Sequence, residues 1–493
     1  MRRLFYNIYL FISFFISKAK YNARPVIDTL EKIDEYKSSD YSVLIISGIV
    51  GIVIGFFVYL FHLTMEFAES FFTFIRVSAS SYLGWYLLII PLIPALGGLI
   101  VGLMRKWVFK NINVDNLDTV VNSIINNHGK IDWRNAFKSI IFAGASIGSG
   151  GGGGREGPTI ALGASIGSSL AQLIGLRRDS RRVLCGAGAA AAISGIFNAP
   201  LGGIVFALEA VVGDVGLKSF VPIVISSVMS TAVSRIFLGD SPLLIAPPMI
   251  EVRFLDYLYL AVLGVLSGFV AVYFIKTFNA TGISFKKRTA KLPELLRPVI
   301  GGFSVGILLM LLPTLLETTY NPINYAISWN TNQLAEDSIF SFFTKILTIE
   351  NVALFGLLAA FSTILLKPIS AALTISSGGA GGAFAPSIKV GAMFGFCFGY
   401  GLHLISPGAS PGLFATVAAG AVLAGTYQLP LAAGIICFEI TKNPELLLPL
   451  IYSSVISSFI VQKMGLRTFN PFQKDTVVDE SRLHPVLKEF DNC

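Results

Sequence analysis

Residues 148–158 read GSGGGGGREGP, and residues 378–386 read the related string GGAGGAFAP. In both strings a run of glycines leads into a proline, and a long apolar stretch without further proline follows. Glycine lets the backbone bend and lets a ligand approach it closely. Proline suits the first turn of a helix, where its missing N–H has no intrahelical partner to lose. Each string therefore predicts a helix that begins directly after a glycine turn.

The two strings are part of a longer internal duplication. Glycines and prolines recur at spacings of four, five and four residues in both halves: Gly154, Pro158, Gly163 and Gly167, then Gly382, Pro386, Gly391 and Gly395. A second block recurs in the same order: Gly195, Pro200, Leu201 and Glu209, then Gly425, Pro430, Leu431 and Glu439. The offsets are 228 and 230 residues. Chance recurrence of Gly and Pro in membrane helices is the alternative, but the shared order favours a duplicated transporter fold with its site at the repeat interface.

Composition places the chain in a membrane. Of 493 residues, 54% are hydrophobic and 13% are charged, whereas soluble domains carry about 25% charged residues. Residues 43–61 and 257–275 contain no charge, and about 20 apolar residues cross a bilayer core. Similar runs cover 86–104, 298–316, 352–366 and 446–461. Shorter runs broken by Gly and Pro predict interrupted helices, which membranes tolerate where they line a cavity. The expected fold is an all-α membrane protein.

The expected domain organisation has three parts. Residues 1–40 form a cytoplasmic or interfacial segment, 41–465 a transmembrane domain with repeats at about 80–235 and 298–465, and 466–493 a short cytoplasmic tail. The net charge of +8 is spread over loops between spans, as expected for cytoplasmic loops of a multi-pass protein and not for a nucleic-acid partner. The compact chain suggests a prokaryotic inner membrane. Four scattered histidines and four unpaired cysteines predict neither a metal site nor disulfides, and no cofactor is expected.

The duplicated strings predict an anion site. A helix N-terminus presents unpaired N–H groups and a partial positive charge, which together bind anions without a formal cation. Two such termini that meet near the middle of the membrane can hold a permeating anion and still release it. Glu156 lies inside the first string, and an intramembrane acid is by default a functional hypothesis. An ionised Glu156 would compete with the anion and so act as a gate; alternatively it pairs with Arg155 and only caps the helix.

Three other positions have structural and functional interpretations. Glu209 and Glu439 occupy matching repeat positions, which favours hydrogen bonds to the backbone in the packing core. Lys389 lies one turn past Pro386 and either raises the local potential for anions, snorkels to the surface or forms an ion pair. Phe384 either lines a pore or packs in the core.

Three motifs resemble the CLC family of chloride channels and proton–chloride exchangers: GREGP at 154–158, GGAFAP at 381–386 and FNAPLGGIVFALE at 197–209. The similarity extends from about residue 40 to 465. It implies a homodimer with one pore per subunit, inverted repeats, Glu156 as the gating glutamate, and backbone amides around Gly157, Ala383 and Phe384 that face the anion path. The candidate anion-binding residues are Gly154, Arg155, Gly157, Pro158, Gly382, Ala383, Phe384, Ala385 and Pro386.

The sequence departs from the family pattern at three places. The serine-containing anion motif expected some forty residues before Glu156 is replaced by NINVDNLDTVV at 111–121, which offers Asp115, Asn113 or Asn116. The internal proton glutamate that many exchangers carry directly after the equivalent of Glu209 is Ala210. The pore tyrosine of the last helix has no counterpart in MGLRTFNPFQ at 464–473, where Phe469, Asn470 or Phe472 stands instead.

Chloride transport through a pore in each subunit, gated by Glu156, is therefore the expected function. Ala210 favours passive conduction slightly over proton-coupled antiport, and another anion such as fluoride or nitrate is a further alternative. An intramembrane enzyme is disfavoured because no second catalytic group accompanies Glu156 in the sequence. A cation transporter is disfavoured because helix N-termini repel cations. The expected partners are chloride, protons in the antiport alternative, the bilayer and a second copy of the chain.

Overall fold

A computed structural model of the chain describes residues 40–80, 89–110, 116–213, 216–336 without 246, 248–251, 253 and 255, residue 338, and residues 352–471. The helices of the first half are α3 (Asp40–Ser80), α5 (Leu92–Trp107), α6 (Leu117–Asn126), α7 (Arg134–Ser146), α8 (Glu156–Leu173), α9 (Arg178–Phe197), α10 (Pro200–Phe206), the π-helical turn η1 (Ala207–Val212) and α11 (Leu217–Leu238). As the sequence indicated, the described chain is helical.

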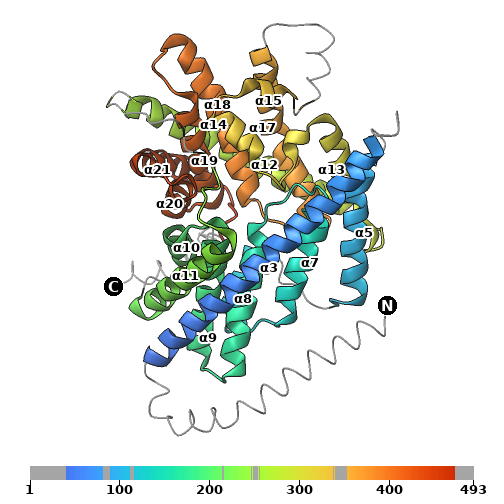
Figure 1. Cartoon of the computed structure of the whole chain (residues 1–493), viewed down its shortest axis with the longest axis vertical. Helices are drawn as coiled ribbons and strands as arrows, with labels where there is room; N and C mark the ends of the chain where they lie inside the picture. Colours follow the sequence, from blue (N-terminus) through green and yellow to red (C-terminus); the bar gives the residue numbers. More distant parts are fainter. Residues whose placement is uncertain are drawn as a thin grey trace, which may run out of the picture.

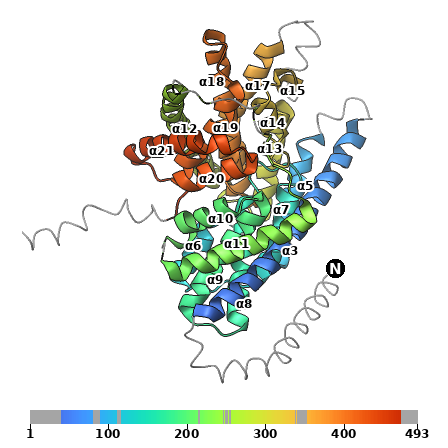
Figure 2. The ribbon, with the colours of Figure 1, turned by 60° about the vertical axis from the view of Figure 1, so that its left-hand side comes forward.

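The second half continues in a similar order. Its helices are α12 (Asp256–Thr289), α13 (Leu296–Leu311), the 3₁₀ turn η2 (Pro313–Leu315), α14 (Asn321–Ile327), α15 (Thr331–Glu336), α17 (Val352–Ser376), α18 (Phe384–Ile405), α19 (Pro411–Tyr427), α20 (Pro430–Thr441), the 3₁₀ turn η3 (Pro444–Leu446) and α21 (Leu447–Lys463). Figures 1 and 2 show most of the blue-to-green helices of the first half in the lower part of the molecule, with α3 running diagonally to the upper right, and the orange-to-red helices mainly in the upper part.

Six helices among the described residues are long and apolar enough to cross a bilayer: Ser42–Ile75, Lys218–Leu238, Asp256–Thr289, Val352–Ser376, Phe384–Ile405 and Pro444–Lys463. Shorter apolar helices, among them α10, α13, α19 and α20, complete the bundle. A short helix can lie at membrane depth because neighbouring helices bury the backbone groups at its ends. The broken apolar runs of the sequence therefore fold as paired short helices.

The duplicated glycines hold equivalent helices close together. A Cβ added at Gly163 would collide with the carbonyl oxygen of Gly188, which lies on α9. In the second half, a Cβ added at Gly391 would collide with the carbonyl oxygen of Ala418 on α19. Small residues allow this close approach of membrane helices. The α8–α9 and α18–α19 pairs are thus built by the same glycine positions, as the duplication predicted.

The second repeated block also folds alike in both halves. α9 ends at Asn198 and α19 ends at Gln428, and both capping residues have a left-handed backbone with φ of 54°. Pro200 then opens α10, and Pro430 opens α20. This equivalence confirms that the repeated Gly-Pro pattern encodes a repeated helix–turn–helix unit.

Several expectations fall outside the described residues. They concern the segment 1–39, Asn113, Asp115, Phe472 and the remainder of the tail to residue 493. The boundaries proposed for the domain and its two repeats stay predictions. Cys185, Cys397 and Cys437 are unpaired and lie within apolar helices, in agreement with a packing role.

Candidate functional site

The two glycine strings meet in the structure. The Gly154 N–H donates to the Gly382 carbonyl at 2.8 Å, and the Gly382 N–H donates to the Gly154 carbonyl at 2.9 Å. These bonds form an isolated antiparallel bridge between segments more than 200 residues apart. Gly157 also packs against this second string, because a Cβ added there would lie 2.9 Å from the carbonyl oxygen of Gly381. The starts of α8 and α18 therefore lie side by side, as the duplicated pattern predicted.

Glu156 lies between the two helix starts and is fully buried. Its Oε1 accepts a hydrogen bond of 3.0 Å from the backbone N–H of Ala385, in the first turn of α18. Its Oε2 is buried without a hydrogen-bond partner and lies next to Gly154, where an added Cβ would collide with it. The carboxylate thus folds back over its own glycine turn and occupies the N-terminus of the opposite helix, where a small anion would bind.

Arg155 makes its contacts with a different segment. Its Nη2 donates to the carbonyl oxygen of Thr318 at 3.1 Å, and its guanidinium lies 5.2 Å from the ring centroid of Tyr320. Among the ion pairs of the described residues, none joins Arg155 to Glu156. The interpretation of Glu156 as an acid in an ion pair with Arg155 is therefore wrong: the arginine side chain contacts the loop after η2, and the carboxylate bonds to the Ala385 N–H.

The remaining candidate residues surround this contact. All nine lie in the two strings, and all are buried except the half-buried Arg155: Gly154, Arg155, Gly157, Pro158, Gly382, Ala383, Phe384, Ala385 and Pro386. Pro158 and Pro386 lie in the first turns of α8 and α18. Ala383 is the residue before α18. The structure thus brings the candidates together; their role in anion binding stays a prediction.

Phe384 packs among aromatic side chains. Its ring centroid lies 5.7 Å from that of Phe197, 5.9 Å from Phe206 and 5.7 Å from Tyr427. Tyr427 in turn lies 5.5 Å from Phe469. The tyrosine in this region, Tyr427, lies at the end of α19 and not near the end of the last helix, α21 (Leu447–Lys463). Nothing in the sequence next to Tyr427, which precedes the αL residue Gln428, indicates that its ring packs against Phe384.

The described part of the segment that replaces the serine motif, residues 116–121, forms the start of α6. Asn116 is the N-cap of that helix, and its Oδ1 accepts a hydrogen bond of 3.1 Å from the Thr119 N–H. Thr119 Oγ1 accepts in return from the Asn116 N–H at 3.1 Å. This reciprocal capping box is a strong helix-start signal. The asparagine side chain is therefore engaged by its own helix.

The paired glutamates bond to backbone groups, as expected. Glu439 on α20 accepts hydrogen bonds from Leu201 N at 3.2 Å and Gly202 N at 2.7 Å, which lie at the start of α10. Glu209 on η1 accepts from Ala432 N at 3.0 Å, at the start of α20. Each half thus caps a helix of the other half. Ala210, next to Glu209, is fully buried in η1.

Lys389 forms an ion pair in the interior and does not snorkel. Its Nζ lies 3.3 Å from Glu317 Oε2, and Lys367 Nζ contacts the same oxygen. Sequence reasoning missed Glu317 and Lys367, although they interrupt the apolar runs that were counted to residues 316 and 366. A charge at the end of such a run is a signal in itself. No group of three or more metal-ligating side chains of the His, Cys, Asp or Glu type occurs among the residues that the structure describes.

Comparisons with known proteins identify the family of the chain. The sequence model of the voltage gated chloride channel family matches residues 97–462. The chain is 28% identical over 455 residues to the H(+)/Cl(-) exchange transporter ClcA of Vibrio parahaemolyticus, a match that covers 89% of this chain and 90% of that protein. It is 28% identical over 370 residues to a putative chloride channel protein ClcB-like of Ralstonia nicotianae, covering 74% and 80% of the two chains.

Solved structures share the fold. The crystal structure of a slow cyanobacterial Cl−/H+ antiporter aligns with a TM-score of 0.72 at 20% identity, covering 89% of this chain and 99% of that one. A eukaryotic CLC transporter aligns with a TM-score of 0.67 at 18% identity, covering 87% and 73%. The family match, the helical fold of these relatives and the two helix starts that meet at Glu156 lead to one conclusion: the chain is an integral membrane protein of the CLC family of anion channels and transporters.

Proposed function

We propose that the chain carries chloride or a similar small anion across the membrane in exchange for protons, with Glu156 as the gate. The observation that carries this proposal is the hydrogen bond from the Ala385 N–H to the buried Glu156 carboxylate. A backbone donor at a helix N-terminus is a binding element for an anion. In this conformation the protein's own carboxylate takes that place.

Protonation of Glu156 gives the exchange its mechanism. An ionised carboxylate binds the α18 N-terminus through a charge-assisted bond, whereas a neutral acid binds it more weakly. A proton that reaches Glu156 therefore releases the side chain and opens the place to an anion. When the anion leaves, the proton is given up and the carboxylate returns. The backbone N–H groups of Gly157, Ala383, Phe384 and Ala385 are the donors that would hold the anion.

Exchange is preferred here to passive conduction, which the sequence alone had favoured slightly. Relatives from several bacteria are named H(+)/Cl(-) exchange transporters, and the cyanobacterial relative by fold is described as an antiporter. Ala210 favours passive conduction. It stands at the position where many exchangers have a proton-carrying glutamate, and an alanine side chain cannot carry a proton toward Glu156. Chloride is the first anion to test, with fluoride and nitrate as alternatives.

A simultaneous recording of chloride and proton movement in liposomes tests the proposal. We expect that purified protein releases chloride and drives protons in the opposite direction at a fixed ratio. Chloride flux without proton movement would decide for a passive channel, and flux of another anion would correct the substrate. If no anion moves at all, the function proposed here is wrong.

A second copy of the chain is part of the proposal. Leu201 and Leu431, at matching positions of α10 and α20, are exposed to 55% and 46%, and the half-buried Glu209 and Glu439 lie on η1, directly after α10, and on α20. Carboxylates that face hydrocarbon are costly, so a partner that covers α10 and α20 would stabilise this face. We therefore expect a homodimer in detergent, measured by light scattering, and residence in a prokaryotic inner membrane.

A further inference from the structure

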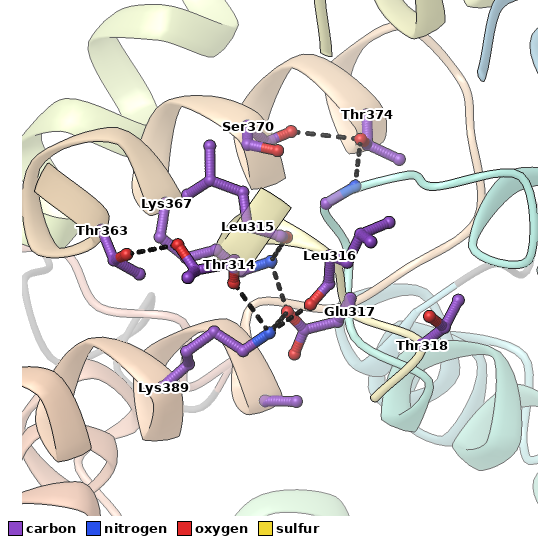
Figure 3. Close-up of polar contacts among 12 residues, drawn as sticks. Thr314, Leu315, Leu316, Glu317, Thr318, Thr363, Lys367, Ser370, Thr374 and Lys389 are labelled. Carbon is purple, nitrogen blue, oxygen red and sulfur yellow. Dashed lines mark hydrogen bonds and ion pairs between the residues drawn. The ribbon is translucent and has the colours of Figure 1, made fainter. Parts of the chain in front are cut away.

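A cluster of three charged side chains lies buried beside the gate. Glu317 follows η2, Lys367 lies in α17 and Lys389 in α18, and their exposed fractions are 5%, 0% and 0%. Figure 3 shows both lysines directed at the Glu317 carboxylate and at the short η2 segment. A buried charge is stable only where partners compensate it. Here the Glu317 carboxylate compensates the two lysines.

The partners of the two ammonium groups are oxygens of one short segment. Lys367 Nζ donates to the Leu315 carbonyl at 2.6 Å, and Lys389 Nζ donates to the Leu316 carbonyl. Both also contact Glu317 Oε2. The cluster therefore holds two positive charges and one negative charge, with carbonyl dipoles around them. One positive charge is left without a carboxylate inside the cluster.

Two connections link the cluster to Glu156. Lys389 lies four residues after Ala385, hence on the same face of α18 one turn further along, and Ala385 donates to Glu156. On α17, Thr374 Oγ1 accepts from the Gly152 N–H at 2.8 Å, within the glycine turn that leads to Glu156. Both Glu317 and Lys367 lie close enough to Glu156 for their charges to interact.

Among the four buried groups Glu156, Glu317, Lys367 and Lys389, the charges balance only while Glu156 is ionised. Two ammonium groups then face two carboxylates, and the half-buried Arg155 adds a positive charge at the edge, beside Tyr320. When Glu156 becomes neutral or swings away, the interior gains one positive charge. One monovalent anion at the α18 N-terminus restores the balance.

We infer that the Glu317–Lys367–Lys389 cluster sets the charge of the anion site, so that one monovalent anion replaces the Glu156 carboxylate. Lys389 raises the affinity for the anion, and Glu317 lowers it enough for the anion to leave. This inference rests on the proposed function of the same site. A cluster that only held the η2 segment in place would not change anion affinity according to the sign of the charge that is removed. The direction of the change in affinity therefore distinguishes the two roles.

The test measures chloride affinity by titration calorimetry in the full-length Glu156→Gln protein, which has no competing carboxylate. Lys389→Met should weaken chloride binding about tenfold, and Glu317→Gln should tighten it about tenfold, since each changes the interior by one unit charge close to the site. The double variant Lys389→Met/Glu317→Gln should return to within about threefold of the parent, because the two changes cancel.

Matched variants separate charge from packing. Lys389→Arg keeps the charge and should keep the affinity, and Lys442→Met removes an exposed lysine that pairs with Asp240 and should change nothing. Where Lys389→Met fails to fold, Lys389→Gln, which can still donate to the Leu316 carbonyl, takes its place. Shifts of the two single variants in the same direction, or no shift in either, would overturn the inference while the proposed function stands. A parent protein that binds no chloride would overturn both.

Discussion

Replacement of Glu156 tests how strongly the carboxylate competes with the anion. In the structure one charge-assisted hydrogen bond, from the Ala385 N–H to Glu156 Oε1, holds the side chain in place. Such a bond is worth about 1.5–3 kcal/mol, and a neutral one about 0.5–1.5 kcal/mol. Glu156→Ala removes the competitor entirely, so chloride affinity at a pH where the wild-type carboxylate is ionised should rise by about one to two orders of magnitude. Glu156→Gln keeps a neutral competitor and should raise it about five- to tenfold.

The pH dependence provides the second measurement of the same experiment. In the wild-type protein chloride binding should weaken as pH rises, because the ionised carboxylate competes and the protonated acid does not. Both variants should bind chloride equally across the pH range, as titration calorimetry in detergent would show. Glu439→Gln is the matched control, since its carboxylate bonds backbone groups outside the site. A pH dependence that persists in both Glu156 variants would refute the gate.

Three further predictions concern stability and coupling. Gly391→Val should lower the unfolding temperature strongly, because its side chain would collide with the Ala418 carbonyl, and overpacking typically costs about 1–3 kcal/mol. Gly401→Ala should leave the unfolding temperature unchanged, because the space around Gly401 is open. A thermal melt in detergent measures both variants. Glu439→Ala and Glu209→Ala should each destabilise the protein, since each removes the acceptor of backbone N–H groups at the start of a short helix in the other half; an unchanged melting temperature in either variant would contradict this. Glu156→Ala should abolish proton counter-flow in liposomes while chloride flux continues, and intact proton coupling in that variant would argue for a different proton carrier.

Much of the fold was predictable because its signals are local and duplicated. The glycine turns, the prolines of the first helical turns and the repeat offsets predicted that the starts of α8 and α18 correspond. The paired roles of Glu209 and Glu439 followed from the same symmetry. These features depend on backbone shape, which glycine and proline encode directly.

The parts that sequence reasoning missed depend on contacts between distant segments. Nothing near Arg155 in the chain indicates that its partner is the Thr318 carbonyl, and nothing near Tyr427 indicates its contact with Phe384. Lys367 and Glu317 are charges at the edges of apolar runs, a visible signal, but their pairing requires the three-dimensional arrangement. Tertiary packing, and not local propensity, decides such positions.

The antiparallel bridge between Gly154 and Gly382 limits how this protein can move. Its two hydrogen bonds join one half of the molecule to the other at the proposed anion site. A transport cycle in which the two halves moved against each other would have to break and re-form these two hydrogen bonds at every turnover. Rotation of the Glu156 side chain alone leaves both hydrogen bonds intact, so the moving part of this transporter can be as small as one glutamate.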